Sequence, residues 1–179
     1  MVDIKGVANP LFLREEELRQ AIEMLFFAYR DFTGEPDAML ADLGLGRAHH
    51  RVIYFVGRNP GITVSELLRI LRITKQSLSR VLSHLVDEAY ILQRPGERDR
   101  RQRLLALTPK GIDLERRLTA NQRERIATAF RNAGAEAVQG FNLVLHGIID
   151  PEDRRRFDVP GIGGASPGTP RLKAGTGKR

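Results

Sequence analysis

Two helix-start signals lie close together in the middle of the chain, and they constrain the fold more than any other feature. Thr63 to Glu66 has the capping-box pattern, in which the Thr hydroxyl and the Glu carboxylate each accept a hydrogen bond from the other residue's backbone N–H. Thr74 is a second N-cap candidate, directly before another stretch of helical apolar spacing. The sequence therefore predicts helices over 64–71 and 74–88, joined by the turn 72–74. These are the dimensions of a helix-turn-helix.

A turn-rich hairpin with many arginines is predicted directly after these helices. Residues 91–94 and 101–107 have the composition of short strands, and the segment 95–100 between them is rich in turn formers and charge. A hairpin in this position is a wing. Charge runs are usually solvated, but arginines on a hairpin beside a recognition helix can contact phosphates or enter a narrow minor groove. The arginines concerned are Arg94, Arg98, Arg100, Arg101 and Arg103.

The helix predicted over 74–88 has one apolar face and one polar face. The side opposite the apolar stripe carries an amide, hydroxyls and cations near the helix N-terminus. Glutamine can pair with adenine, arginine with guanine, and a helix N-terminus favours phosphate, so this face suits the major groove. Any surface helix also presents polar groups, so the assignment depends on the neighbouring turn and wing. The candidate DNA-contacting residues of this segment are Thr74, Lys75, Gln76, Ser77, Ser79, Arg80 and Ser83.

Further helices are predicted on both sides of this unit. An apolar stripe predicts a helix over 12–32, which Gly34-Glu35-Pro36 is expected to end. Thr108-Pro109 is a strong helix start, because proline is favoured at the first helical position. The expected fold class is mainly α with a small β-hairpin wing. The remaining predictions are a short helical turn over 37–43, helices over 47–57, 109–131 and 135–149, and a disordered basic tail over 159–179.

Composition excludes several classes of protein. The chain of 179 residues has no cysteine, which excludes disulfides, thiolate zinc sites and thiol-based redox sensing. No apolar run approaches the roughly 18 residues of a membrane span and no signal peptide is evident, which predicts a cytoplasmic protein. The formal net charge of +7 favours a polyanionic partner. No phosphate-binding loop, nucleophile elbow or dinucleotide fingerprint is present, so we expect neither an enzyme nor a cofactor.

The histidines give little support for a metal site. His49 and His50 are adjacent in sequence, so on a helix their side chains point about 100° apart, which is poor geometry for chelation. Lone histidines such as His84 and His146 are more often structural than ligands. We therefore expect no metal.

Several of these segments resemble the MarR family of regulators. Asp99-Arg100-Arg101, followed after five residues by Leu107 to Gly111, is similar to the wing signature of that family. The runs 74–81 and 85–91 are similar to its recognition helix and to its helix-to-strand transition. The resemblance covers about 12–149 in element order, and its motifs are specific over 63–111.

The resemblance implies an obligate homodimer that binds double-stranded DNA. Residues 12–33 and 109–149 would form a helical dimerisation region, and 37–107 a winged helix-turn-helix DNA-binding domain. Asp99 and Arg101 would form an ion pair that stabilises the wing, with Arg98 or Arg100 on DNA. A two-fold dimer would bind a pseudo-palindromic operator. The basic tail 159–179 departs from the family pattern, and its role is left open.

Relatives in this family often bind a small aromatic or anionic effector, which would shift the population of dimers away from the form that binds DNA. Ordinary packing is the favoured interpretation for any single residue of the cleft that the resemblance implies. The expected cleft residues are Phe26, Arg30, His49, His50 and Tyr54.

Three functions remain in competition. The chain is a sequence-specific dimeric transcriptional regulator, a non-specific or architectural nucleic-acid-binding protein, or a winged helix that binds only protein. The recognition face has no acidic residue before Asp87, which argues against the third. Competition between specific and random duplex separates the first two.

Overall fold

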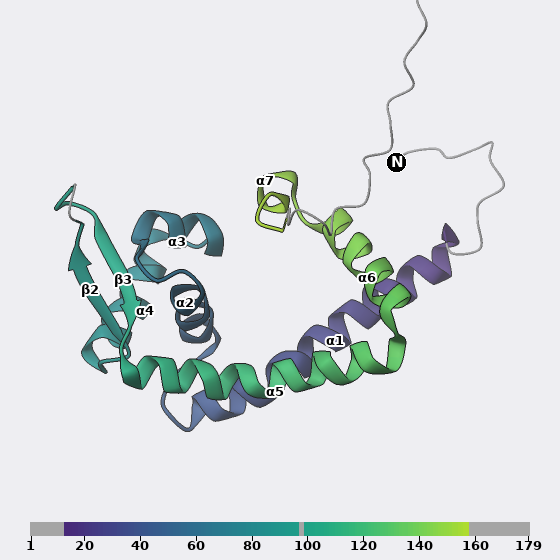
Figure 1. Cartoon of the computed structure of the whole chain (residues 1–179), viewed down its shortest axis with the longest axis horizontal. Coiled ribbons are helices and arrows are strands. Elements are labelled where there is room, and N and C mark those ends of the chain that lie inside the picture. Colours follow the sequence, from purple (N-terminus) through teal and green to yellow (C-terminus); the bar gives the residue numbers. More distant parts are fainter. Residues whose placement is uncertain (1–12, 97–98, 158–179) are drawn as a thin grey trace, which may run out of the picture. The chain divides into compact units, whose positions relative to one another are not determined.

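The computed structural model describes residues 13–96 and 99–157 and confirms the predicted fold class, mainly helical with a small antiparallel sheet (Figure 1). The chain divides into two compact units, 1–128 and 129–179, which are described separately below. The predicted tail, 159–179, lies outside the described residues. The elements in chain order are α1 (Glu15–Ala41), α2 (Arg47–Arg58), β1 (Ile62–Thr63), α3 (Val64–Leu71), α4 (Lys75–Asp87), β2 (Ile91–Pro95), β3 (Arg103–Leu107), α5 (Pro109–Ala133), α6 (Ala135–Ile148) and α7 (Pro151–Arg154).

The two predicted helix starts are confirmed in atomic detail. The Thr63 hydroxyl accepts from the Glu66 N–H at 3.1 Å, and the Glu66 carboxylate accepts from the Thr63 N–H at 2.9 Å, which completes the capping box of α3. The Thr74 hydroxyl accepts from the Ser77 N–H at 3.2 Å and caps α4. Both helices therefore begin where side chains satisfy backbone donors that have no partner within the helix.

The helix-turn-helix packs in one core with a three-stranded sheet of order β1-β3-β2, in which β2 and β3 form the wing. Leu105 of β3 pairs with Ile62 on one side and Gln93 on the other. The sequence did not predict β1, because a strand of two residues is too short to show a period of two. The predicted strand over 101–107 was too long at its start, since β3 begins at Arg103.

The prediction that α1 ends at Gly34-Glu35-Pro36 was wrong. The helix continues to Ala41, so the separate turn over 37–43 was also wrong in its first part. Pro36 has no N–H to donate to the Phe32 carbonyl one turn earlier. The side-chain amide of Gln122 on α5 donates to that carbonyl instead, at 3.2 Å. A residue distant in sequence thus replaces the hydrogen bond that proline removes, and the helix persists.

The last third of α1 is anchored in the core, whereas its first two-thirds is exposed. The buried residues of α1 are Thr33, Pro36 and Leu40. These pack with a core contributed by every other helix of the first unit and by the sheet. Its largest fully buried side chains include Val52, Ile53, Val56, Leu67, Leu78, Leu85, Ile91, Leu105 and Leu118.

The second unit contains α6 and α7. The ring of Phe130, in the last turns of α5, contacts Phe141 of α6 edge to face, with centroids 5.8 Å apart. The Arg154 side chain donates to the carbonyls of Ile149 and Gly147 at 2.7 and 2.9 Å, which satisfies acceptors at the C-terminus of α6. Among the described helices, none is both long enough and apolar enough to span a membrane.

Candidate nucleic-acid interface

Helix α4 buries one face and exposes the other, as its sequence pattern predicts. Leu78, Leu82 and Leu85 are at most 4% exposed and pack into the core. The polar side lies in solvent. The exposed candidates are Lys75, Gln76, Ser79, Arg80 and Ser83.

The N-terminus of α4 is positive and free of acidic side chains. Its first turn contains no Asp or Glu, so the partial positive charge of the helix N-terminus and the Lys75 ammonium are not neutralised there. Thr74 and Ser77 have a local task at this end, because the Thr74 hydroxyl also donates to Ser77 Oγ at 2.9 Å. Ser77 is half-buried. These two side chains stabilise the start of the helix through local hydrogen bonds.

The wing carries exposed arginines on both of its strands. Arg94 and Arg103, which belong to the predicted arginine cluster but are not among the candidate DNA contacts, lie on β2 and β3, one register position apart on the paired strands. Arg100 and Arg101 are exposed beyond the strand ends, and Arg98 lies outside the described residues. In Figure 1 the β2–β3 hairpin projects beyond α3 and α4.

Asp99 stabilises the wing turn through the backbone. Its carboxylate accepts from the Arg101 N–H at 2.9 Å, an arrangement typical of Asx turns. Asp99 and Arg101 are adjacent in this turn, and the contact that the structure describes uses the Arg101 main chain in place of the expected side-chain ion pair. The Arg101 side chain is exposed.

The end of α4 is joined firmly to the wing and to α5. The Tyr90 N–H donates to the Leu85 carbonyl at 2.8 Å and the Ala89 N–H to Val86 at 2.9 Å, with Ala89 at φ 56°, which is a Schellman motif. Lys110 of α5 donates to the Glu88 carbonyl at 2.7 Å and lies 4.1 Å above the Tyr90 ring. The recognition helix and wing are thus held as one body.

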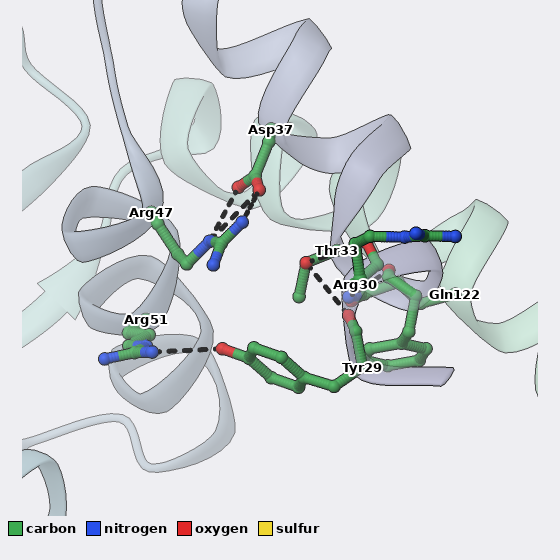
Figure 2. A network of polar contacts seen from close by, with 8 residues as sticks. Tyr29, Arg30, Thr33, Asp37, Arg47, Arg51 and Gln122 are labelled. Carbon is green, nitrogen blue, oxygen red and sulfur yellow. Dashed lines mark hydrogen bonds and ion pairs between the residues drawn. The ribbon is translucent and has the colours of Figure 1, made fainter. Parts of the chain in front are cut away.

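Polar contacts connect α1 to α2 (Figure 2). Asp37 of α1 forms an ion pair with Arg47 of α2, with Arg47 Nε 3.0 Å from a carboxylate oxygen. The Arg51 guanidinium donates to the Tyr29 hydroxyl at 3.0 Å, and Arg47 lies 5.8 Å from the Tyr29 ring centroid. Thr33 donates back to the Tyr29 carbonyl at 3.0 Å. Two arginines of α2 therefore contact one aromatic residue and one carboxylate of α1.

The residues expected to line an effector cleft fall into two groups. Phe26 and Arg30 are exposed on α1, Phe26 by 63%. On α2, His50 is 8% exposed, and His49 contacts the Gly46 N–H and the His84 ring. Tyr54 is half-buried, with its ring edge to face with Phe55.

Burial lowers the pKa of both His49 and His50 below the usual value of 6.5. Both rings are therefore neutral at pH 7, and neither provides a fixed cation for an anionic ligand. Among the residues that the structure describes, no group of three or more His, Asp or Glu side chains is arranged to hold a metal ion.

Known proteins share this sequence pattern and this fold. The sequence model of the MarR family matches residues 43–102. The HTH-type transcriptional regulator PetP of Rhodobacter capsulatus is 50% identical over 154 residues, which are 86% of this chain and 93% of that regulator.

Two similar solved structures contain DNA. Streptococcus pneumoniae FabT in complex with DNA superposes with a TM-score of 0.65 and 19% identity, over 73% of this chain and 94% of FabT. A mutant MarR of E. coli with operator DNA superposes with a TM-score of 0.57 and 19% identity, over 79% of this chain and 99% of that one. These likenesses show a shared fold. Together with the identity to PetP, they establish that the chain belongs to the MarR family of winged helix-turn-helix transcriptional regulators.

Proposed function

We propose that this regulator is a homodimer that recognises a pseudo-palindromic operator, with α4 in the major groove and the wing on the neighbouring backbone. The observation that carries the proposal is the exposed, acid-free N-terminal half of α4, which presents Lys75, Gln76, Ser79 and Arg80 beside an arginine-bearing hairpin. The fold is that of two proteins solved on DNA. An α-helix fits the major groove, and exposed amide and guanidinium groups on it can form the hydrogen bonds that distinguish one base pair from another.

Apolar side chains left in solvent support the dimer. Along α1 the exposed fractions reach 69% for Ile22 and 63% for Phe26, and on α6 they reach 62% for Val144 and Ile148. Monomers rarely expose contiguous apolar faces of this kind. A second copy of the chain would bury them, and a two-fold dimer would place two α4 helices on successive major grooves. Light scattering at micromolar concentration tests this, and a monomer would contradict it.

Competition binding tests sequence specificity. At fixed salt, a specific regulator should prefer a duplex from its own upstream region over random duplex by about 10³-fold or more. A ratio near one would instead support the non-specific nucleic-acid-binding alternative. Absence of binding to either duplex would support the third alternative, a winged helix that binds only protein.

Two arginine variants separate base contact from backbone contact. Arg80→Ala should cost about 1–3 kcal/mol on the specific duplex and little on random duplex, because α4 would lose a base contact. Arg100→Ala should weaken both duplexes alike and lower the salt dependence of binding. Arg116→Ala on α5, whose side chain is 74% exposed, is the matched loss of charge and should change neither. Equal losses on both duplexes for Arg80→Ala would contradict its assignment.

A small aromatic anion is the effector class that we propose for this protein. Phe26 and Arg30 supply an exposed ring and an exposed guanidinium one helical turn apart on α1. Benzoate is the simplest probe. It should raise the melting temperature and reduce operator affinity, and Phe26→Ala should weaken both effects. No thermal shift at millimolar benzoate would remove this class.

A further inference from the structure

Two histidines from different helices form a hydrogen bond that has no part in the proposed DNA contacts. His49 lies in the first turn of α2 and His84 in the last turn of α4. His49 Nε2 is 3.1 Å from His84 Nδ1, and the rings meet edge to face with centroids 5.0 Å apart. Both rings are half-buried. The pair therefore connects the start of α2 directly to the helix that carries the DNA-contacting face.

A backbone amide fixes the direction of this hydrogen bond. The Gly46 N–H points at His49 Nδ1, at 3.0 Å, and a backbone N–H can only donate. His49 Nδ1 must then accept, so the ring proton of His49 is on Nε2 and is donated to His84 Nδ1. His84 in turn carries its proton on Nε2. Both rings are neutral in this arrangement.

One added proton breaks the chain of hydrogen bonds at either ring. A proton on His84 Nδ1 would face the N–H of His49, and a proton on His49 Nδ1 would face the N–H of Gly46. In either case two donors oppose each other, and a hydrogen bond becomes a repulsive contact. The rings must then separate, or the N-terminus of α2 must move.

The surroundings of His49 do not favour a charged ring. Burial is the largest effect that lowers the pKa of His49, and the electrostatic effect of His84 lowers it further. On α2 and α1, Arg47 forms an ion pair with Asp37, and the Arg51 guanidinium donates to the Tyr29 hydroxyl. On α4 and just beyond it, Glu88 lies 3.7 Å from Lys110, and Arg80 and Asp87 are exposed. His50 is buried next to His49, and burial keeps it neutral as well.

We propose that the His49–His84 pair is a proton-sensitive link that fixes α4 against α2, so that uptake of a proton reduces the preference of the protein for its operator over other DNA. This inference rests on the proposed function, because α4 must contact bases for its placement to matter. The preference is the informative quantity. An extra positive charge alone would raise affinity for every duplex, whereas a displaced helix lowers only the specific component.

Ring tautomers test the link without DNA. In the full-length protein at about pH 8, ¹⁵N shifts of the imidazoles should show the proton of both His49 and His84 on Nε2. His49 with its proton on Nδ1 would overturn the inference. The protection of α4 amides against exchange, corrected for the intrinsic rate at each pH, should decrease between about pH 7.5 and pH 5.5, and unchanged protection would also overturn it.

Competition binding tests the consequence. For the wild type, the ratio of affinities for a duplex of its own upstream region and a random duplex should fall about two- to tenfold between about pH 7.5 and pH 5.5, the worth of one hydrogen bond. His84→Leu should have the lower ratio at both pH values. His84→Asn, which keeps an acceptor near the position of Nδ1 but does not titrate, should restore most of the ratio and flatten the profile.

His146→Asn on α6 removes a histidine outside the pair and should keep the wild-type profile, and circular dichroism establishes that each variant is folded. A wild-type ratio that is high and equal at both pH values overturns the link and leaves the proposed function intact. No preference at any pH overturns the proposed function, and the tautomers and amide exchange then decide on the link. A His84→Leu variant with the wild-type pH profile also overturns it.

Discussion

Gly111 stands where α5 meets the first strand of the wing, and replacing it by alanine should destabilise the protein. A Cβ built on Gly111 lies 2.1 Å from the Tyr90 carbonyl oxygen and 3.3 Å from Leu107 Cβ. The Tyr90 carbonyl cannot rotate away freely, because it accepts from the Thr108 N–H at 3.0 Å. Thr108 itself caps α5 by accepting from the Gly111 N–H at 3.0 Å. The added methyl group must therefore push α5 off the sheet.

The size of the effect follows from three terms. Overpacking costs about 1–3 kcal/mol, and weakening the Thr108–Tyr90 hydrogen bond costs about 1 kcal/mol. The higher helix propensity of alanine offsets about 1 kcal/mol of this cost. Gly111→Ala should thus lower the free energy of unfolding by about 2 kcal/mol. That corresponds to a fall of about 4–8 °C in melting temperature for a chain of this size.

Thermal unfolding followed by circular dichroism measures this at one fixed protomer concentration, since the proposed dimer would couple stability to concentration. Gly34→Ala in α1 is the matched control, because its added Cβ meets no atom within 4 Å. It should raise stability by about 0.5–1 kcal/mol through helix propensity alone. If Gly111→Ala were also stabilising, the close approach of α5 to Tyr90 would be refuted.

Three further predictions concern the same unit. Ala89→Gly should stabilise by about 0.5–1 kcal/mol in urea unfolding, since Ala89 has φ 56° at the end of α4, where glycine has no steric penalty; a loss of stability would contradict the Schellman geometry. Gln122→Leu should cost about 1–3 kcal/mol by leaving the Phe32 carbonyl without its donor, and a neutral result would show that water replaces the amide. Burial lowers the pKa of His49 and His50 in the folded state, so below about pH 6.5 the unfolded chain binds protons first and stability falls with pH. The double change of both histidines to Gln should flatten the melting temperature between about pH 7.5 and pH 5.5, and an unchanged slope would assign the effect to other groups.

Local hydrogen bonding explains which elements the sequence predicted. Thr63, Glu66 and Thr74 satisfy helix donors within three residues of themselves, so their effect is visible in a short window. The same holds for Thr108, whose hydroxyl accepts from Gly111. Turn formers over 95–100 between two strand-like segments predicted the wing, and the family motifs around 99–101 and 107–111 agree with that prediction. The helix-turn-helix needed nothing distant to be recognised.

Distant partners explain what the sequence did not predict. Gly34 and Pro36 are strong breakers locally, and α1 continues through them because Gln122, on another helix, satisfies the freed Phe32 carbonyl. Strand β1 exists only as a partner of β3. The His49–His84 pair joins residues from α2 and α4 that share no sequence pattern. Each of these features is a tertiary contact, and no local propensity encodes it.

The two ends of α1 differ in how firmly they are held, and this difference bears on regulation. Thr33, Pro36 and Leu40 are buried, so the C-terminal third is fixed by the core. Between Leu13 and Thr33, the polar and ring contacts to α2 that the structure describes are the Tyr29–Arg51 hydrogen bond and the ring contact of Tyr29 with Arg47. Exposed polar contacts of this kind contribute about 0–1 kcal/mol each, so the N-terminal two-thirds of α1 is weakly held within one chain.

A weakly held, apolar helix is stabilised chiefly by what covers it. If a second copy covers the exposed face of α1, then dimer formation and the order of this helix become one equilibrium. A ligand that contacts Phe26 or Arg30 would act on that same equilibrium, with little strain on the core around Leu40. Arg47 and Arg51 of α2 contact Asp37 and Tyr29 of α1, and His49 of the same helix contacts His84 of α4, so α2 touches both α1 and α4. In the proposed dimer, a change in α1 would thus alter the position of one protomer relative to the other, whereas protonation of the His49–His84 pair would act within the helix-turn-helix itself.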